Sequence, residues 1–466
     1  MKKNISTILL ATLACWQITY AQTPKTAEVW LTHADQSKLF EKQAETFTFS
    51  PQSSTLPTIF VDEKQSFQSM DGFGFTLTGG SATLLWQMDA DKRKALLKEL
   101  FAFDGKNIGI SYLRVSIGAS DLSDHVFTYN DLPTGQTDLK IQKFDLSEEK
   151  KALIPVLKEI LSINPAIKIL GSPWTPPVWM KTNTNSKGGS LLPNYYDAYA
   201  LYFVKYIQSM KKEGIHIDAI TIQNEPLHPG NNPSLLMQPE EQAAFIKKSL
   251  GKAFKSAKIA TKIWLYDHNA DRPDYPISIL NDPEVRQYVD GSAFHLYGGS
   301  VENIRQVHEA HPDKNLYFTE QWIGAPGNFA GDLAWHIKTL IIGATRNWCK
   351  TVLEWNLAAD PQQNPHTDGG CTECLGALTI DKNEIKRNPA YYIIAHASKL
   401  VRPGARRISS NTTMDLQNVA FKTTDGKIVL VVLNESNKPS TFIISHQGLK
   451  LQQTLNAGAV ATYCWK

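Results

Sequence analysis

The sequence predicts an α/β protein: a (β/α)8 TIM barrel with a flanking all-β side domain formed by the N- and C-terminal segments. Two observations predict this class. From residue 68 to residue 402, short apolar runs alternate with amphipathic helical segments, whereas residues 22–67 and 403–466 contain mostly short β-branched runs. Repeated alternation of strand and helix is typical of a parallel barrel with an outer ring of helices.

The first 21 residues, MKKNISTILLATLACWQITYA, have the composition of an export signal. They combine two lysines, a short apolar run and a small residue at the exit, and the run is too short to span a bilayer. We expect cleavage before Gln22 and a periplasmic, outer-surface or secreted protein. Lipidation at Cys15 is an alternative, although the preceding Thr-Leu-Ala matches a lipoprotein signal poorly.

The remaining chain is close to electrically neutral. Removal of Lys2 and Lys3 lowers the formal net charge from +3 to +1. This balance gives no electrostatic reason to expect a nucleic acid or an acidic membrane surface as a partner. No other segment reaches the length of a membrane span. Separately, we expect the protein to be a monomer.

The terminal segments are expected to pair into one β unit. The N-terminal part contains AEVWLT, ETFTFS and PTIFVDE, and the C-terminal part contains KPSTFIIS and NAGAVATYCWK. Asp425-Gly426 separates two β-branched runs, which is a strong hairpin signal. The C-terminal unit could be an independent binding module, but packing against the barrel is the favoured interpretation.

The middle of the chain contains eight apolar runs and at least seven amphipathic helices. The runs lie at residues 70–77, 109–118, 167–173, 217–226, 262–269, 291–299, 315–322 and 349–358. The helices are expected at residues 90–101, 147–161, 195–212, 239–256, 301–310, 332–348 and 389–400, with Ser147 capping the second. An open doubly wound sheet is the alternative, but no G-x-G-x-x-G follows the first run.

Most of the runs end in polar or aromatic residues, which a parallel barrel would bring to one face. These residues are Arg114, Trp174, Asn224, Glu225, Asp267, His268, His295, Tyr297, Glu320 and Trp355. A barrel built only for stability needs no carboxylates, guanidinium or indoles at these positions. We expect Asp267 and His268 only to line the wall, because no H-E-x-x-H or similar spacing indicates a metal site.

Glu225 and Glu320 are the candidate catalytic pair. Glu225 follows the run IHIDAITI in QNEP, where Pro226 should end the strand, and Glu320 ends the seventh run. Two carboxylates at one barrel mouth suit cleavage of a glycosidic bond: about 5–5.5 Å between them gives retention of configuration and about 6.5–9.5 Å gives inversion. The alternative for either residue is a surface ion pair. The chemistry requires no cofactor.

The neighbouring residues suggest supporting roles. Asn224 could hydrogen-bond a substrate hydroxyl, and Arg114 and Tyr297 could lower the pKa of an ionised carboxylate partner. Strand alternation allows either Glu354 or Trp355 to face the barrel interior, and we favour Trp355.

The cysteines indicate a disulfide rather than a metal site. Cys371 and Cys374 form a C-x-x-C with no second pair or nearby histidines, so a local disulfide is expected in an oxidising compartment, with a thioredoxin-like redox role as a more distant alternative.

The segments GFGFTLTGGSA, YLRVSIGASD, GSPWTPPVWMKTN, TIQNEP, AFHLYGG, FTEQW and EWNLA occur in this order. Together they resemble glycoside hydrolase family 30, the glucosylceramidase and β-1,6-glucanase family. The resemblance implies a retaining two-step mechanism with Glu225 as general acid/base and Glu320 as nucleophile. It further implies that Arg114 and Tyr297 orient the nucleophile, and that Trp174, Asn224 and Trp355 hold the sugar. His295 is a further candidate substrate-binding residue.

One position departs from the resemblance. Glucosylceramidases carry an acidic residue after G-F-G-G-A-x-T, taken to bind glucose hydroxyls, where this sequence has Gly79. We therefore expect Gly79 and Gly80 to leave room for a longer chain, and an endo-acting β-1,6-glucanase that takes a β-glucan as substrate. A glucosylceramidase, exo-β-glucosidase or β-xylosidase activity is the alternative, and a non-catalytic glycan-binding protein is a more distant one.

Overall fold

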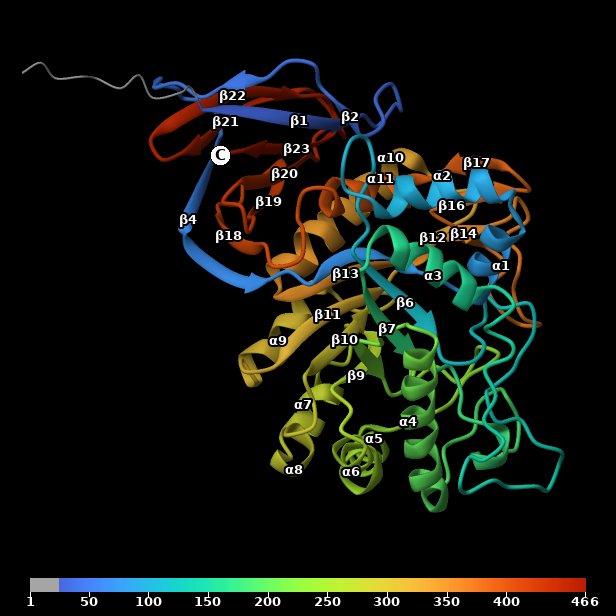
Figure 1. Ribbon diagram of the computed structural model, residues 1–466. Coiled ribbons are helices and arrows are strands. Elements are labelled where there is room, and N and C mark those ends of the chain that lie inside the picture. Colours follow the sequence, from blue (N-terminus) through green and yellow to red (C-terminus); the bar gives the residue numbers. More distant parts are fainter. Residues whose placement is uncertain (1–24) are drawn as a thin grey trace, which may run out of the picture.

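The computed structural model describes residues 25–466, so the predicted export signal, with Cys15, lies outside the described residues. Eight parallel strands close into a barrel in the order β10-β11-β13-β5-β6-β7-β8-β9 (Figure 1). They are β5 (Gly72–Thr76), β6 (Tyr112–Ser116), β7 (Lys168–Ser172), β8 (Ala219–Thr221), β9 (Lys262–Asn269), β10 (Gly291–His295), β11 (Asn315–Glu320) and β13 (Cys349–Asn356). Each strand lies within one of the eight predicted apolar runs, which confirms the barrel.

Helices cover the outside of the barrel. They are α1 (Gly79–Gln87), α2 (Ala90–Phe101), α3 (Leu153–Ile163), α4 (Tyr196–Lys212), α5 (Pro239–Phe245), α6 (Gly251–Ser256), α7 (Asp274–Leu280), α8 (Pro283–Arg286), α9 (Ile304–Ala310), α10 (Phe329–His336) and α11 (Pro389–Ser398). π-helical segments at Ile246–Leu250 and Ile337–Ala344 continue α5 and α10. Within residues 25–466, no helix combines the length and the apolar character that crossing a membrane requires.

The prediction of a helix from residue 147 is wrong in its first part, because α3 begins only at Leu153. Residues 147–152 form turns, and Ser147 does not cap the helix. Its backbone N–H and its hydroxyl both donate to the carboxylate of Asp145, at 2.9 and 2.7 Å. Such local bonds compete with helix formation. Helices α1, α7 and α8 were not predicted.

The two ends of the chain form one β unit, as predicted. Its strands are β1 (Thr26–Thr32), β2 (Glu41–Lys42), β3 (Phe47–Thr48), β4 (Thr58–Ser69), β18 (Arg406–Ser410), β19 (Leu416–Lys422), β20 (Ile428–Asn434), β21 (Ser440–His446), β22 (Leu449–Leu455) and β23 (Val460–Trp465). β1 pairs with β23, and β4 pairs with both β18 and β21, so blue and red strands adjoin in Figure 1. The predicted hairpin at Asp425-Gly426 joins β19 and β20.

This β unit packs against the barrel rather than standing apart. Along β20, Val429, Val431 and Leu433 join the core shared with the barrel helices, whereas the alternate residues join the core of the β unit itself. Burial of one such side chain stabilises by about 1.5–3 kcal/mol. His396 of α11 also bridges Thr32 and Thr462 of the β unit, at 2.8 and 2.9 Å.

The barrel interior is filled by an apolar layer. Seven strands each contribute one residue to it: Tyr112, Leu170, Ala219, Trp264, Ala293, Tyr317 and Leu353. Because strand side chains alternate between the two faces, residues two positions further along point into the same interior, closer to the carboxyl ends of the strands. The apolar layer therefore forms a rigid floor beneath those residues.

Candidate active site

A polar layer lies directly above the apolar floor. Its members are Arg114, Ser172, Thr221, Asp267, His295 and Thr319, all buried. Five of them lie two positions after a residue of the apolar layer, as strand periodicity requires, and Asp267 lies three positions after Trp264. The barrel interior thus changes, within two or three residues along each of these strands, from apolar core side chains to polar side chains that can support a reaction.

Bulges in the strands explain the irregular spacing. The register of β9 against β10 shifts at Asp267, and the register of β10 against β11 shifts at Thr319. Tyr266 and Asp267 have positive φ angles of 70° and 65°. A bulge adds one residue and redirects the side chains after it. Thr319 and Glu320, although adjacent in sequence, therefore both reach the site.

Asp267 is the centre of the polar layer. Its carboxylate accepts hydrogen bonds from five side chains: Arg114 Nη2 at 2.8 Å, Ser172 Oγ at 2.8 Å, Thr221 Oγ1 at 2.7 Å, His295 Nε2 at 3.1 Å and Thr319 Oγ1 at 2.6 Å. Burial alone would raise the pKa of Asp267, but Arg114, His295 and the donated hydrogen bonds hold it well below its ordinary value. Asp267 is thus an ionised anchor below the site, not the wall residue that was predicted.

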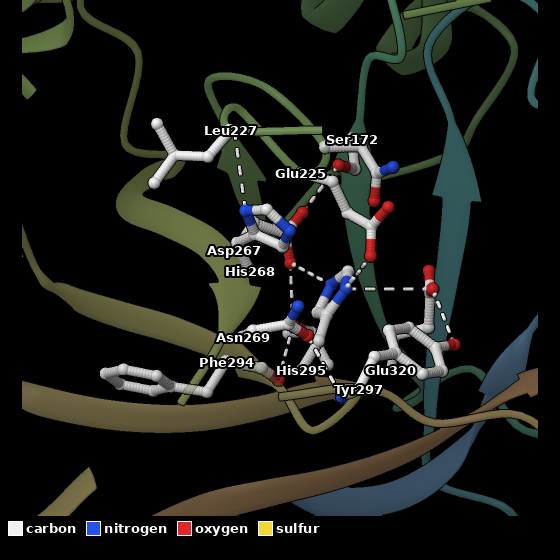
Figure 2. A network of polar contacts seen from close by, with 12 residues as sticks. Ser172, Glu225, Leu227, Asp267, His268, Asn269, Phe294, His295, Tyr297 and Glu320 are labelled. Carbon is white, nitrogen blue, oxygen red and sulfur yellow. Dashed lines mark hydrogen bonds and ion pairs between the residues drawn. The ribbon is translucent and has the colours of Figure 1, made fainter. Parts of the chain in front are cut away.

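The two candidate catalytic carboxylates both point toward His295, a member of this layer (Figure 2). Glu320 accepts from Arg114 Nη1 at 2.5 Å and from the hydroxyl of Tyr297 at 2.9 Å. Glu225 accepts from His295 Nδ1 at 3.2 Å and adopts a positive φ of 45°. One oxygen of Glu225, one nitrogen of His295 and one oxygen of Glu320 lie within 4.8 Å of one another.

His295 is held as a cation. Nε2 faces Asp267 and Nδ1 faces Glu225, so both ring nitrogens must carry protons to donate. Burial opposes this charge, but Glu320, Asp267 and Glu225 outweigh it and raise the pKa of His295 to about 9. Glu225, His295 and Glu320 are residue types that can ligate a metal, but here the positive charge of His295 offsets the negative charge of the carboxylates. His295 therefore shapes the charge of both carboxyl groups.

The two carboxyl groups respond in opposite directions. Burial raises the pKa of Glu225, but the hydrogen bond and charge of His295 bring it below its ordinary value. Burial and the negative charge of Glu225 raise the pKa of Glu320. The positive charges of His295 and Arg114 lower it, but the net result is a pKa above the ordinary value. With Nδ1 of His295 only 3.7 Å from Glu320, the two glutamates compete for one proton beside a shared cation.

A pocket of about 330 Å³ opens above the carboxylates. Six of the eight residues predicted to act in catalysis or substrate binding line it: Trp174, Asn224, Glu225, Tyr297, Glu320 and Trp355. Arg114 and His295 do not line it but lie beneath it, fully buried. The two indoles of the wall pack together with ring centroids 5.5 Å apart. Trp355 faces the pocket, while Glu354 turns away to bind His336 at 2.8 Å, as strand alternation predicted.

Two polar groups of the pocket wall have hydrogen-bond donors without a partner in residues 25–466. The side-chain carbonyl oxygen of Asn224 accepts a hydrogen bond from Arg114 Nη2 at 2.7 Å. This bond fixes the orientation of the side-chain amide and does not use its N–H donors. The indole N–H of Trp174 is buried and finds no acceptor within residues 25–466. Aromatic walls with a few directed donors suit a polyhydroxylated ligand.

Comparison with known proteins agrees with this geometry. A family profile described as the glycosyl hydrolase family 30 TIM-barrel domain matches residues 70–401, and the profile of the family 30 beta sandwich domain matches residues 404–463. The chain belongs to glycoside hydrolase family 30.

Relatives of this family 30 chain include two kinds of enzyme. The endo-1,6-beta-D-glucanase neg1 of Aspergillus fumigatus is 36% identical over 414 residues, covering 83% of each chain. The lysosomal acid glucosylceramidase of Mus musculus is 29% identical over 435 residues, covering 87% of this chain and 83% of the relative. Among solved structures, the endo-beta1,6-glucanase BT3312 is 38% identical with a TM-score of 0.87, covering 94% of this chain and 99% of that one. The chain is thus a glycoside hydrolase.

The structure of this family 30 hydrolase corrects the expectation at Gly79 and Gly80. Neither glycine lines the pocket, because both lie at the start of α1. A Cβ at Gly79 would lie 2.9 Å from the hydroxyl of Ser123, and one at Gly80 would lie 2.9 Å from Pro365. The glycines therefore permit close packing of the helix and leave no room for substrate.

The sequence reasoning missed Asp121. This residue ends the quoted segment YLRVSIGASD, and the structure places its nearly buried carboxyl group in the pocket. Burial, with the charges of Glu320 and Glu225, raises the pKa of Asp121 to about 7. Its position three residues after the second apolar run was the available signal. Asp121 supplies a pocket carboxyl group that Gly79 does not.

The predicted disulfide is present in this hydrolase. Cys371 and Cys374 are bonded, and both line the pocket. In the part of the chain that the structure describes, Cys349 and Cys464 are free and buried. The C-x-x-C thus belongs to the pocket wall.

Proposed function

We propose that this glycoside hydrolase cleaves β-1,6-linked glucan within the chain and retains the configuration of the anomeric carbon. The observation that carries the mechanism is the approach of Glu225 and Glu320, whose nearest oxygens lie within 4.8 Å. Retaining pairs stand about 5–5.5 Å apart, and inverting pairs need about 6.5–9.5 Å to admit a water. The short separation favours a covalent intermediate.

In the empty pocket the hydrogen bond and charge of His295 lower the pKa of Glu225 and burial raises that of Glu320, so binding of substrate has to move the proton they share from Glu320 to Glu225. In the first step, Glu225 then donates this proton to the leaving oxygen while the carboxylate of Glu320 attacks the anomeric carbon. Arg114 and Tyr297 fix that carboxylate from two directions. In the second step, Glu225, now ionised, takes a proton from a water molecule, which attacks the same carbon and releases Glu320. The proton on Glu225 is thus given and regained within one turnover.

The substrate proposal depends on the relatives. The relative and the solved structure named as endo-β-1,6-glucanases are 36% and 38% identical to this chain, whereas the glucosylceramidase is 29% identical. Within the pocket, Trp174 and Trp355 offer apolar faces to a sugar ring, and Asn224 and Asp121 offer polar groups to its hydroxyls. A glucosylceramidase or exo-β-glucosidase activity is the second candidate.

Hydrolysis of linear β-1,6-, β-1,3- and β-1,4-linked glucans tests this proposal. We expect the β-1,6-glucan to give a ladder of short oligosaccharides early in the reaction, with the other two largely intact. Products would be separated by anion-exchange chromatography. Glucose as the sole early product would show exo action instead, and faster cleavage of glucosylceramide would favour the second candidate.

We propose that the protein is exported. Residues 1–21 have the composition of a leader sequence, and Cys371 and Cys374 form a disulfide of the kind that persists in oxidising compartments. Expression of the full sequence, followed by fractionation and N-terminal sequencing of the product, tests this: a product beginning at Gln22 outside the cytoplasm is expected.

Asp121→Asn should weaken catalysis but stabilise the fold at neutral pH. Loss of a charged hydrogen bond to a sugar hydroxyl costs about 1.5–3 kcal/mol, so kcat/KM should fall by roughly 10- to 100-fold. The pKa of Asp121 is raised to about 7 in the folded state, so ionisation destabilises the fold increasingly from about pH 4 to pH 7. The amide removes this penalty, so urea denaturation should show a gain at pH 8 and none at pH 4.

A further inference from the structure

The wall of the pocket across from Glu225 is built from a loop that the mechanism does not use. Glu225 follows β8, and the loop of residues 360–374 follows β13, four places away in the ring of eight strands. Because Glu225 gives its proton to the leaving group, the departing part of the substrate lies on the Glu225 side. The part of the chain that precedes the cleaved sugar must then run toward the opposite wall.

The disulfide loop, residues 367–375, is tied to three parts of the site. The backbone N–H of Thr367 donates to the carbonyl of Asp121 at 2.9 Å. Asn232, in the segment after Glu225, donates to the carbonyl of Asp368 at 2.9 Å. β15 (Cys374–Leu375) pairs with β12 (Ile323–Gly324), which begins three residues after Glu320. The loop is thus a fixed wall.

Trp322 completes this wall. It lies two residues after Glu320, lines the pocket and is only partly buried. It packs with Cys371 against a cluster made of Leu122, Trp174, Trp355 and Cys374. Trp174 and Trp355 are almost fully buried at the base of the pocket, so Trp322 and the disulfide extend the same apolar surface outward.

We propose that Trp322 and the Cys371–Cys374 disulfide form the subsite for the glucosyl residue that precedes the cleaved one. The apolar C–H face of that residue stacks on the indole, and the disulfide holds the loop that supports the indole. The inference rests on the proposed retaining cleavage of β-1,6-glucan, because Glu225 defines the leaving-group side. It assigns Trp322 as a specificity-determining residue.

The test compares two substrates with the same leaving group: p-nitrophenyl β-glucoside and p-nitrophenyl β-gentiobioside, which has one more β-1,6-linked glucosyl residue. Trp322→Ala should lower kcat/KM on the gentiobioside about tenfold, mainly through KM, since the stacking contact with the indole is lost. Activity on the glucoside should stay within about twofold. Trp322→Phe should restore most of the loss. Trp335→Ala, at an exposed indole on α10, is the matched control and should change neither substrate.

Equal losses on both substrates would assign Trp322 a structural role and overturn the subsite, and so would no loss on either. Cys371→Ser/Cys374→Ser should behave as Trp322→Ala does. Titration of gentiobiose into Glu320→Gln, with and without Trp322→Ala, measures the subsite without turnover, and an unchanged Kd would also overturn it. If the wild type cleaves the gentiobioside but not polymeric β-1,6-glucan, the proposed function fails while the subsite stands.

Discussion

Replacement of Glu320 by glutamine should lower kcat by about 10⁴-fold or more while KM changes by only a few-fold. Glu320 is the proposed nucleophile, and removal of such a group abolishes the step that forms the covalent intermediate, with losses of this size being typical. The amide preserves the shape of the side chain, and Arg114 keeps its ion pair with Asp267, so the fold should persist. Steady-state kinetics on β-1,6-glucan and circular dichroism would measure both outcomes.

Azide separates the roles of the two glutamates. With Glu320→Gly, azide can occupy the vacated face and displace an activated aryl leaving group directly, giving the α-glucosyl azide. With Glu225→Ala, Glu320 still forms the intermediate and azide replaces water, giving the β-glucosyl azide. The reverse pattern would exchange the two assignments. Glu354→Gln is the control for Glu320→Gln: it makes the same chemical change at a buried strand glutamate bound to His336, and it should leave kcat/KM nearly unchanged.

Strand periodicity was enough to predict the barrel and the face on which the candidate site lies. Each apolar run had strand length, ended in polar residues and was followed by a helical segment, so convergence of Glu225 and Glu320 follows from topology alone. Regular alternation does not predict bulges, however. The bulge at Asp267 turns this carboxylate into the barrel, where Arg114 and His295 meet it. The central anchor of the site was therefore mistaken for a wall residue.

The error at Gly79 has a different origin. A missing side chain was interpreted as open space, but a glycine can equally mark a close contact. Here Ser123 and Pro365 fill the space beside the two glycines. The pocket carboxyl group comes instead from Asp121, whose place just after the second apolar run suggests the right end of the barrel but not that its side chain enters the pocket. Likewise, the C-x-x-C spacing predicted the disulfide, but only the pairing of β12 with β15 brings it to the pocket.

Replacement of Asp267 by asparagine should cost about 3–5 kcal/mol of the free energy of unfolding. Arg114 and Asp267 form an ion pair in which both side chains are fully buried, and loss of one partner leaves the other charge poorly compensated. Five donors also lose a charged acceptor. Urea denaturation would measure the loss. Asp271→Ala, at an exposed carboxylate four residues later, is the control and should stay within about 0.5 kcal/mol of the wild type.

Asp267→Asn should also change how the free energy of unfolding depends on pH, because the charge of Asp267 stabilises the protonated form of His295. The folded-state pKa of His295, about 9, exceeds its ordinary value of 6.5, so its protonation stabilises the fold fully below pH 6.5 and this contribution disappears as pH rises through 9. A shift of this size corresponds to about 3 kcal/mol. Without the charge at Asp267 the pKa of His295 falls toward 6.5, so the loss of stability between pH 6.5 and pH 9.5 should be smaller in Asp267→Asn than in the wild type. Parallel stability profiles over this range would show that His295 does not carry the buried positive charge in the folded protein.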